Sequence, residues 1–417
     1  MTGPSPRVLK FGGSSLASTE GRRNALAIIE RSYRRGPVAV VVSALGGVTD
    51  HLAAAVEMGG RGLDEALRAV HLRALTESLG AAPSDAVAQP LGELFEELKE
   101  VLRREPEDLR RRESRDRVLS IGERASVTVM AALLDTAGIT VTTSDEAPIR
   151  TDSTFGNARP LAMPTREFLL PLAAQSFSSG SVLLLPGFLG VDRRGRRTTL
   201  GRGGSDYSGA LVAAALGAER LEIWSDVDGL LAADPRWVPR AATLPAVSYR
   251  EAEQLARFGA KVLDRRTPRP LKNLAIPIHL RNTFRPAAPG TRVLDGPDRI
   301  QGLALATCRA YFQSDGPDDG ALVLFRPNGE AVRVRTLEVQ AARSGPRTAV
   351  PVSLLAALSS PFGGPELNEI LARVGVTPLA EKGGGVHLML LPENDLPRAM
   401  VALHQGAGAY FRRRKAS

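Results

Sequence analysis

A lysine followed by two glycines stands near the start of the chain, and these residue types suit the binding of a phosphate group. The apolar residues 8–11 predict a strand that carries Lys10 and ends at Gly12 and Gly13. Glycines let backbone N–H groups approach a phosphate closely, and the ammonium of Lys10 would neutralise its charge. The alternative is a tight turn beside a solvated lysine. Only six of the 54 basic residues are lysines, which favours a specific role for Lys10.

A second glycine-rich motif, GRGGSD, covers residues 201–206. Its glycines permit close approach of a ligand, and Arg202 can bind a carboxylate or a phosphate through two parallel hydrogen bonds. Ser205 or Asp206 can cap the alanine-rich helix predicted from residue 207, whose N-terminus attracts anions. The alternative is a flexible loop with an ordinary helix cap.

Two further segments contain charged residues after regular elements. Ser225 and Asp226 begin SDVDG, which follows a predicted strand at 221–224. This segment is either an Asp-Gly turn or a contact to a nucleotide or hydrated magnesium. Lys261 follows a predicted helix at 249–258, where it is either a helix C-terminal charge or a second phosphate contact.

Alternating strands and helices must position these residues. Strands are predicted at 8–11, 38–42, 139–143, 182–185, 221–224 and 276–280, and helices at 18–35, 64–112 with an interruption at 80–90, 207–216 and 249–258. This order predicts an α/β fold with a mostly parallel sheet covered by helices on both faces. Ligands of such sheets bind beyond the carboxyl ends of the strands. The glycine turns at 12–13, 46–47 and 203–204 and the Asp226 turn are therefore expected at one edge.

A proline-rich segment at 285–297 indicates a boundary before a smaller α+β region. In that region helices are predicted at 366–374 and 396–404 and strands at 376–379 and 386–391. Residues 300–342 contain strand-like pieces at 321–325 and 331–335 but no long helical pattern.

The bulk composition indicates an ordinary globular protein of two or three domains, with 417 residues, 43% hydrophobic and 24% charged. No apolar run is long enough to span a membrane, and residues 1–10 lack the apolar segment of a secretory signal. A single cysteine, Cys308, excludes an internal disulfide framework and suits a reducing cytoplasm. The net charge of +9 comes largely from clusters at 103–117 and 412–415, which lack interleaved aromatic residues, so no nucleic-acid partner is expected.

Taken together, the motifs make residues 7–295 resemble the aspartate kinases. They occur in the order of that family: KFGGSS (10–15), SALGGVT (43–49), IGER (121–124), FGNARP (155–160), GFLG (187–190), TTLGRGGSDYSGALVAAALGA (198–218), IWSDVDGLLAADPR (223–236) and FGAKVL (258–263). The resemblance implies the amino-acid kinase fold and ATP-dependent phosphorylation of the L-aspartate side chain to 4-phospho-L-aspartate. That reaction opens the pathway to lysine, threonine and methionine.

The resemblance also implies roles for individual residues. Lys10 and Asp206 match catalytic positions. The positions that match aspartate contacts are Ser43, Thr49, Glu123, Arg202, Gly203 and Ser205, with Arg202 on the α-carboxylate and Glu123 on the ammonium. The positions that match ATP contacts are Lys10, Gly12, Gly13, Ser14, Ser225, Asp226, Leu231, Arg236, Lys261 and Val262. Mg²⁺ would arrive with ATP, without a direct protein ligand.

This chemistry fits the residue types. Phosphoryl transfer to a carboxylate brings two anions together, so positioning and positive charge are the main requirements. A carboxylate is already a competent nucleophile, which explains why no histidine or cysteine occurs in the catalytic motifs.

The chain departs from the family pattern at two places. Asp264 and Arg265 stand where the family commonly has a His-Pro pair. Related enzymes carry two βαββαβ regulatory ACT domains, whereas residues 298–417 are short for two copies. We therefore expect a catalytic domain at 1–295 and an ACT-like regulatory or dimerisation region at 296–417, with a degenerate first repeat at 298–345 and a second at 346–412. That region would join chains into a homo-oligomer, while its response to lysine or threonine is left open.

Two other functions are compatible with the motifs. One is a kinase of the same fold that acts on a different acidic substrate in a specialised pathway. The other is a catalytically silent relative that binds an amino acid or a nucleotide and regulates a partner. A silent relative would be expected to lose Lys10, Asp206 or Glu123, and all three are present.

Overall fold

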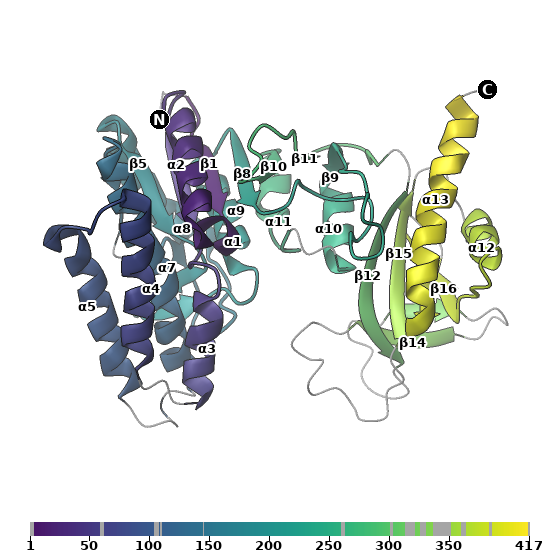
Figure 1. Cartoon of the computed structure of the whole chain (residues 1–417), viewed down its shortest axis with the longest axis horizontal. Coiled ribbons are helices and arrows are strands. Elements are labelled where there is room, and N and C mark those ends of the chain that lie inside the picture. The colour runs from purple at the N-terminus through teal and green to yellow at the C-terminus, as the bar shows by residue number, and fades with distance from the viewer. Residues whose placement is uncertain are drawn as a thin grey trace. The chain divides into compact units, whose positions relative to one another are not determined.

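The computed structural model describes residues 4–58, 62–103, 108, 111–144, 146–259, 263–300, 303–312, 322–325, 331–336, 352–359, 364–382 and 386–415. Internal contacts divide the chain into two units (Figure 1). The first unit contains Met1–Asp228 and Arg266–Leu294, and the second contains Gly229–Arg265 and Asp295–Ser417.

A mainly parallel sheet forms the centre of the first unit. Its strands lie in the order β3 (Val141–Thr142), β5 (Val182–Pro186), β2 (Val38–Val42), β1 (Arg7–Phe11), β8 (Arg220–Ser225), β10 (Ile278–Asn282) and β11 (Thr291–Leu294). All neighbours are parallel except β10 and β11. The predicted α/β class and parallel sheet are confirmed. Every residue of β1, β2 and β5 is buried, as expected for strands covered on both faces.

Helices cover the two faces of this sheet. On one face, Leu9 and Phe11 share a core with residues of α2 (Thr19–Tyr33) and α7 (Arg112–Thr136). On the other face, which carries Lys10, α9 (Gly204–Leu216) packs on β1, and α8 (Ala162–Ser178) packs against α9. Side chains alternate along a strand, so Leu9 and Lys10 necessarily face opposite layers.

The connections also place the site. The five-residue helix α1 (Gly13–Ala17) begins inside the predicted glycine turn, and Ser18 then caps α2 by accepting a hydrogen bond from the Gly21 N–H, as predicted. Helices α3 (Val48–Met58), α4 (Leu63–Leu79) and α5 (Asp85–Leu102) follow β2. The predicted interruption of the helical region is confirmed at Gly80, but Pro90 lies inside α5. Strands β4 (Ile149–Arg150), β6 (Leu189–Val191) and β7 (Arg197–Thr199) form a small second sheet.

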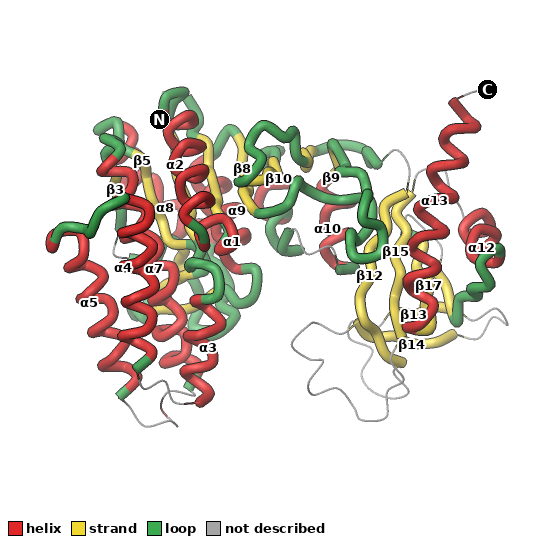
Figure 2. The backbone as a smooth tube through the Cα atoms, viewed as in Figure 1, coloured by secondary structure: helices red, strands yellow, loops and turns green. Residues whose placement is uncertain are grey.

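In the second unit, strands pair antiparallel into a closed sheet (Figure 2). Their order is β12 (Leu303–Phe312), β14 (Ala331–Thr336), β13 (Leu322–Phe325), β16 (Ala380–Lys382), β17 (His387–Pro392) and β15 (Val352–Ser359), which pairs with β12 again. Helices α12 (Gly364–Ala372) and α13 (Leu396–Lys415) share a core with this sheet. The short 3₁₀ helix η2 (Glu393–Asp395) directly precedes α13. The strand predicted at 376–379 was wrong, because β16 begins at Ala380.

The segment 229–265, with β9 (Ala246–Ser248) and α10 (Tyr249–Arg257), belongs to this second unit by its contacts. The Leu305 N–H donates to the Ala232 carbonyl at 2.8 Å, and the Glu251 carboxylate accepts hydrogen bonds from the N–H groups of Arg299 and Ile300. The remaining helix, α11 (Arg269–Lys272), returns the chain to the first unit. The sequence-based boundary at 295 remains a prediction, since this grouping by contacts is a different division of the chain.

The degenerate repeat predicted at 298–345 also remains a prediction. Its described residues form β12, β13 and β14, whereas residues 313–321 and 337–350 lie outside the described part of the chain. Within the described ranges, no helix is both long enough and apolar enough to cross a membrane.

Candidate active site

The loops that follow the central strands lie side by side at one edge of the first unit's sheet. The Gly12 N–H donates to the Trp224 carbonyl at 3.0 Å, and the Ser43 N–H donates to the Phe11 carbonyl at 3.1 Å. The Gly187 N–H donates to the Val42 carbonyl at 2.8 Å. A Cβ on Gly187 would lie 3.0 Å from the Cβ of Ser205, so the start of α9 meets the same edge. The predicted gathering of the glycine turns is confirmed.

Lys10 is buried at this edge and forms an ion pair with Asp206. Only 6% of Lys10 is exposed, and its Nζ lies 2.5 Å from Oδ1 of Asp206 in the first turn of α9. The pair requires α9 to lie close to β1, and Gly209 permits this because a Cβ there would lie 3.2 Å from the Lys10 Cβ. A buried ammonium is tolerated when a carboxylate compensates it. The charge of Lys10 is therefore held in one place before any ligand arrives.

The turn after β1 allows close approach of backbone groups. A Cβ on Gly13 would lie only 2.8 Å from the Ala44 carbonyl oxygen, so no other residue fits there without movement of the loop after β2. A Cβ on Gly12 would lie 3.6 Å from the Nζ of Lys10. Ser14 donates its hydroxyl to the Asp226 carboxylate at 3.1 Å, which links this turn to the loop after β8. Ser225, at the end of β8, is half-buried.

Glu123 contributes a buried carboxylate from α7. It is 3% exposed, and its Oε2 has no hydrogen-bond partner among the described residues. Helix α7 reaches the loop after β2 because Gly122 packs on Ala44, where a Cβ would lie 2.9 Å from the Ala44 Cβ. Burial raises the pKa of Glu123 to about 8, although the Ala44 N–H and the charge of Lys10 act in the opposite direction. The site thus contains a carboxylate oxygen that is not satisfied by the protein.

Ser43 and Thr49 belong to the same loop. Ser43 is buried directly after β2, and Thr49 is half-buried in the first turn of α3. Both residues therefore lie on the segment that Gly13 and Gly122 contact.

The motif at 201–206 is held by its backbone, whereas the Arg202 side chain is exposed. Gly201 and Gly203 have φ values of 73° and 71°, in the left-handed region that glycine adopts without strain. Arg266 donates to the Leu200 carbonyl at 2.7 Å and to the Arg202 carbonyl at 2.5 Å. The loop is fixed while the Arg202 guanidinium stays available to a ligand.

Asp116, a residue that the sequence analysis missed, supports this loop. It is fully buried and accepts hydrogen bonds of 2.8 Å from the Gly156 N–H, the Thr199 N–H and the Thr199 hydroxyl. These bonds join α7, the loop 151–160 and β7. Burial is the main reason that the pKa of Asp116 is raised. In the sequence the motifs at 155–160 and 198–218 contain its partners Gly156 and Thr199, but no motif contains Asp116.

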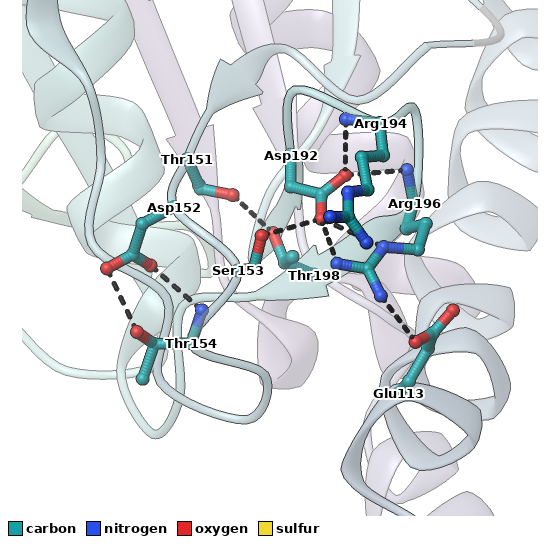
Figure 3. A network of polar contacts seen from close by, with 9 residues as sticks. All are labelled: Glu113, Thr151, Asp152, Ser153, Thr154, Asp192, Arg194, Arg196 and Thr198. Carbon is teal, nitrogen blue, oxygen red and sulfur yellow. Dashed lines mark hydrogen bonds and ion pairs between the residues drawn. The ribbon is translucent and has the colours of Figure 1, made fainter.

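Asp192 organises the hairpin between β6 and β7, as Figure 3 shows. Its carboxylate accepts hydrogen bonds from the Arg196 guanidinium, the N–H groups of Arg194 and Arg196 and the Ser153 hydroxyl. Burial alone would raise the pKa of Asp192, but these hydrogen bonds lower it to about 2. Arg196 also pairs with Glu113 of α7 at 2.9 Å. This network is structural, because every partner lies within the protein.

Four of the sequence-predicted nucleotide residues fall outside the described residues of the first unit, so their role remains a prediction. Leu231 and Arg236 belong to the second unit, where Leu231 forms a β-bridge with Thr243 and the exposed Arg236 pairs with Asp234 at 2.5 Å. Lys261 and Val262 lie outside the described residues.

The fold and the site define an α/β protein that presents a glycine turn and a fixed lysine at the edge of a parallel sheet. The family model of the amino acid kinase family matches residues 5–282. The chain belongs to the amino acid kinase family.

Within this family, the chain is similar in sequence to several aspartokinases. The chain is 33% identical over 331 residues to a bifunctional aspartokinase/homoserine dehydrogenase of Haemophilus influenzae, a match that covers 75% of this chain and 40% of that protein. It is 33% identical over 308 residues to aspartokinase 1, chloroplastic, of Arabidopsis thaliana, covering 71% of this chain and 53% of that one. The chain therefore spans about half the length of these relatives.

A solved structure shares the fold. The crystal structure of E. coli aspartokinase III in complex with aspartate and ADP has a TM-score of 0.77 and 23% identity, and the match covers 96% of this chain and 99% of that chain.

Glu123 gives a prediction about stability and pH. Its pKa is about 8 in the folded protein, above the value of about 4.3 expected in the unfolded chain. Between these values the folded state keeps a proton that the unfolded state has lost, so this residue makes the free energy of unfolding fall as pH rises from about 5 to 8. In Glu123→Gln the free energy of unfolding should therefore decrease by about 3–5 kcal/mol less than in the wild type over this pH range. Urea denaturation at several pH values would measure the difference.

The matched control is Glu20→Gln, which removes an exposed carboxylate in the first turn of α2. It should leave the pH dependence close to that of the wild type. An equal pH dependence in Glu123→Gln and the wild type would contradict the raised pKa.

Proposed function

We propose that this chain is an aspartate kinase, which transfers the γ-phosphoryl group of ATP to the side-chain carboxylate of L-aspartate and forms 4-phospho-L-aspartate. The observation that carries the proposal is one site with two opposite features: the fixed Lys10–Asp206 pair and the unpaired buried carboxylate of Glu123. The first suits a transferring phosphoryl group, and the second suits the ammonium of an amino acid. Similarity to aspartokinases of about 33% identity supports the same assignment.

The nucleotide would bind on the side of the glycine turn. Gly12, Gly13 and Ser14 would surround the β- and γ-phosphates, because the close packing on Ala44 leaves no room for a side chain at Gly13. Ser225 and Asp226 would contact ATP from the loop after β8. Family resemblance adds Leu231, Arg236, Lys261 and Val262 as further nucleotide contacts.

Magnesium would enter with ATP. Mg²⁺ generally keeps several waters and binds one or two carboxylates together with the phosphates of the substrate. The residues present fit a hydrated ion carried by ATP, because the exposed carboxylate of Asp226 lies at the glycine turn through its bond to Ser14 and would accept hydrogen bonds from the waters of the ion. When bound, the ion would shield the negative charge of the phosphates.

Aspartate would bind on the side of the site that carries Glu123 and Arg202, away from the glycine turn. Arg202 would hold its α-carboxylate, because the guanidinium is exposed and planar. Glu123 would release its proton to solvent and, as a carboxylate, pair with the ammonium of aspartate. Ser43, Thr49, Gly203 and Ser205 would line the rest of the substrate site.

The transfer itself needs little proton movement. One oxygen of the aspartate side chain forms a bond to the γ-phosphorus, while the bond from that phosphorus to the bridging oxygen breaks and its electron pair leaves with ADP. Lys10 would reduce the repulsion between the two anions, and Asp206 would keep Lys10 in position. No histidine or cysteine is required as a base, because the attacking carboxylate is already ionised.

The alternatives are less well supported. A silent relative would not need the Lys10–Asp206 pair, which remains intact at the sheet edge. A kinase of another acidic substrate would share the phosphate half of the site and differ in the half around Glu123 and Arg202.

The second unit would serve regulation and assembly. We expect residues 296–417 to be ACT-like and to join chains into a homo-oligomer, with its antiparallel sheet and the helices α12 and α13 as the framework. A location in the cytoplasm fits the single cysteine and the proposed biosynthetic role.

The direct test is ADP release from ATP and Mg²⁺ with L-aspartate, L-glutamate or no amino acid, each with and without lysine and threonine. Aspartate-dependent turnover is expected, with less than about a tenth of that rate on glutamate. Folded protein that binds ATP but gives no turnover with aspartate would contradict the proposal. Insensitivity to both effectors would show that the second unit does not transmit feedback.

Lys10→Ala should lower kcat by about 10²–10³-fold, because it removes the positive charge nearest the transferring phosphoryl group. Steady-state kinetics with saturating ATP and aspartate would measure the effect, and circular dichroism would verify the fold. Lys99→Ala, at a half-buried position of α5 outside the candidate site, is the control and should keep wild-type kcat. Near-wild-type turnover in Lys10→Ala would exclude the catalytic role.

Arg202→Ala should raise the KM for aspartate by about 10- to 100-fold, the size expected for a lost hydrogen bond to a charged group, and should change the KM for ATP much less. Arg193→Ala removes an exposed arginine from the β6–β7 hairpin and should leave both values unchanged. An unchanged aspartate KM in Arg202→Ala would remove this residue from the substrate site.

A further inference from the structure

A second polar site lies on the face of the central sheet opposite Lys10. A cavity of about 140 Å³, open to solvent on one side, lies between the C-terminal end of α2 and strands β1, β8 and β10. Five arginines line it: Arg7, Arg31, Arg35, Arg220 and Arg281. Arg7 and Lys10 belong to the same strand but have opposite parity, so this cavity and the candidate active site are on different faces.

Strand register explains why distant arginines converge. Arg7 of β1 is directly opposite Arg220 of β8, and Arg281 of β10 is opposite Trp224, which has the same parity as Arg220. The three side chains therefore share one face of the sheet. Arg31 in the last turn of α2 and Arg35 just after it cover that face from above.

The cavity contains more positive than negative charge. Glu222 is the only carboxylate in its lining, and it accepts a hydrogen bond from Nε of Arg220 at 2.7 Å. Outside the lining, Glu219 pairs with Arg220 and lies 3.8 Å from Nε of Arg7. In the described part of the chain, Arg31 and Arg35 have no carboxylate within ion-pair distance.

Two of the arginines are incompletely hydrogen-bonded: Arg7 is buried and Arg281 is half-buried. Arg7 is 6% exposed, and its side chain makes no hydrogen bond to another described residue. Burial and the nearby Arg220 lower the pKa of Arg7. Arg281 donates from Nη2 to the Pro286 carbonyl at 2.7 Å and stacks over Trp224, but its buried Nε has no partner in the described structure. The buried Nε of Arg281 is a costly donor unless a ligand or water satisfies it.

We propose that this cavity binds a phosphate-type oxyanion, either inorganic phosphate or the phosphate group of a monoester. Planar guanidinium groups match the oxygens of a phosphate in geometry and in charge. The volume of about 140 Å³ equals that of about four or five water molecules and is below the range of about 300–1,000 Å³ of drug-sized pockets, which suits a small oxyanion better than a whole nucleotide. Ile28 is the only apolar side chain in the lining, which leaves no surface for a base to stack on.

Bound phosphate would offset the repulsion among the arginines and stabilise the first unit. A ligand that binds only the folded state raises stability in proportion to the logarithm of its concentration above Kd. This role is independent of the proposed kinase activity, because none of the lining residues belongs to the candidate active site.

The test uses the full-length protein and isothermal titration calorimetry with inorganic phosphate and, separately, glycerol 3-phosphate, in a buffer of constant ionic strength set with chloride. The double variant Arg31→Gln with Arg35→Gln removes two charges from the cavity wall. The matched control, Arg23→Gln with Arg34→Gln, removes two exposed charges at the same helix but outside the lining. Lys10→Ala identifies any phosphate bound at the glycine turn.

We expect one phosphate per chain in the wild type, the matched control and Lys10→Ala, and at least a tenfold weaker Kd in the cavity variant. Phosphate should also raise the Tm of every protein except the cavity variant. Tighter binding of glycerol 3-phosphate would identify a monoester as the ligand, and binding of inorganic phosphate alone would identify the free ion. The proposal would be overturned if phosphate did not bind, if the two double variants bound it with equal affinity, or if only Lys10→Ala lost binding. It would also be overturned if chloride raised the Tm as much as phosphate does.

Discussion

The ion pair between Lys10 and Asp206 is the constraint on which the rest of the first unit depends. An ammonium in the most central part of a parallel sheet is unfavourable unless a carboxylate meets it, so α9 must begin at the carboxyl edge of β1 and lie close to that strand. Gly209 makes this distance possible. The packing of α9 on β1 therefore fixes the position of the Lys10 ammonium. The proposed phosphoryl transfer would use this charge, which is in place before a substrate binds.

Close backbone contacts at the sheet edge also fix the positions of the site residues. Gly13 packs on the carbonyl of Ala44, and Gly122 packs on its Cβ, so the turn after β1, the loop after β2 and helix α7 meet around one residue. Side chains of any size at these two glycines would separate the glycine turn from Glu123. The distance between the proposed phosphate half and the proposed amino-acid half of the site is thus set by the absence of two Cβ atoms.

The buried charges near the two faces of the sheet differ in how they are satisfied. Asp116 and Asp192 are surrounded by internal donors and stabilise loops, whereas Glu123 has an unpartnered oxygen and the arginine cavity has unpartnered donors. Polar groups of the second kind are costly in a folded protein and are retained where a ligand completes them. Glu123 and Arg281 are two such groups of the first unit, one acidic and one basic, and the proposed ligands would complete both.

The sequence by itself determined the parallel α/β class, the residues at the ends of the central strands and the aspartate kinase resemblance, because hydrophobic period and glycine motifs are local properties of the chain. It did not indicate Asp116, whose partners Gly156 and Thr199 are 40 and 83 positions away. Nor did it indicate the arginine cavity, since Arg7, Arg220 and Arg281 are far apart in the sequence and belong to no shared motif. The strand register places them on one face of the sheet. Only the tertiary structure decided these features and the contacts of residues 229–265 with the second unit, because each depends on which segments pack together rather than on what each segment contains.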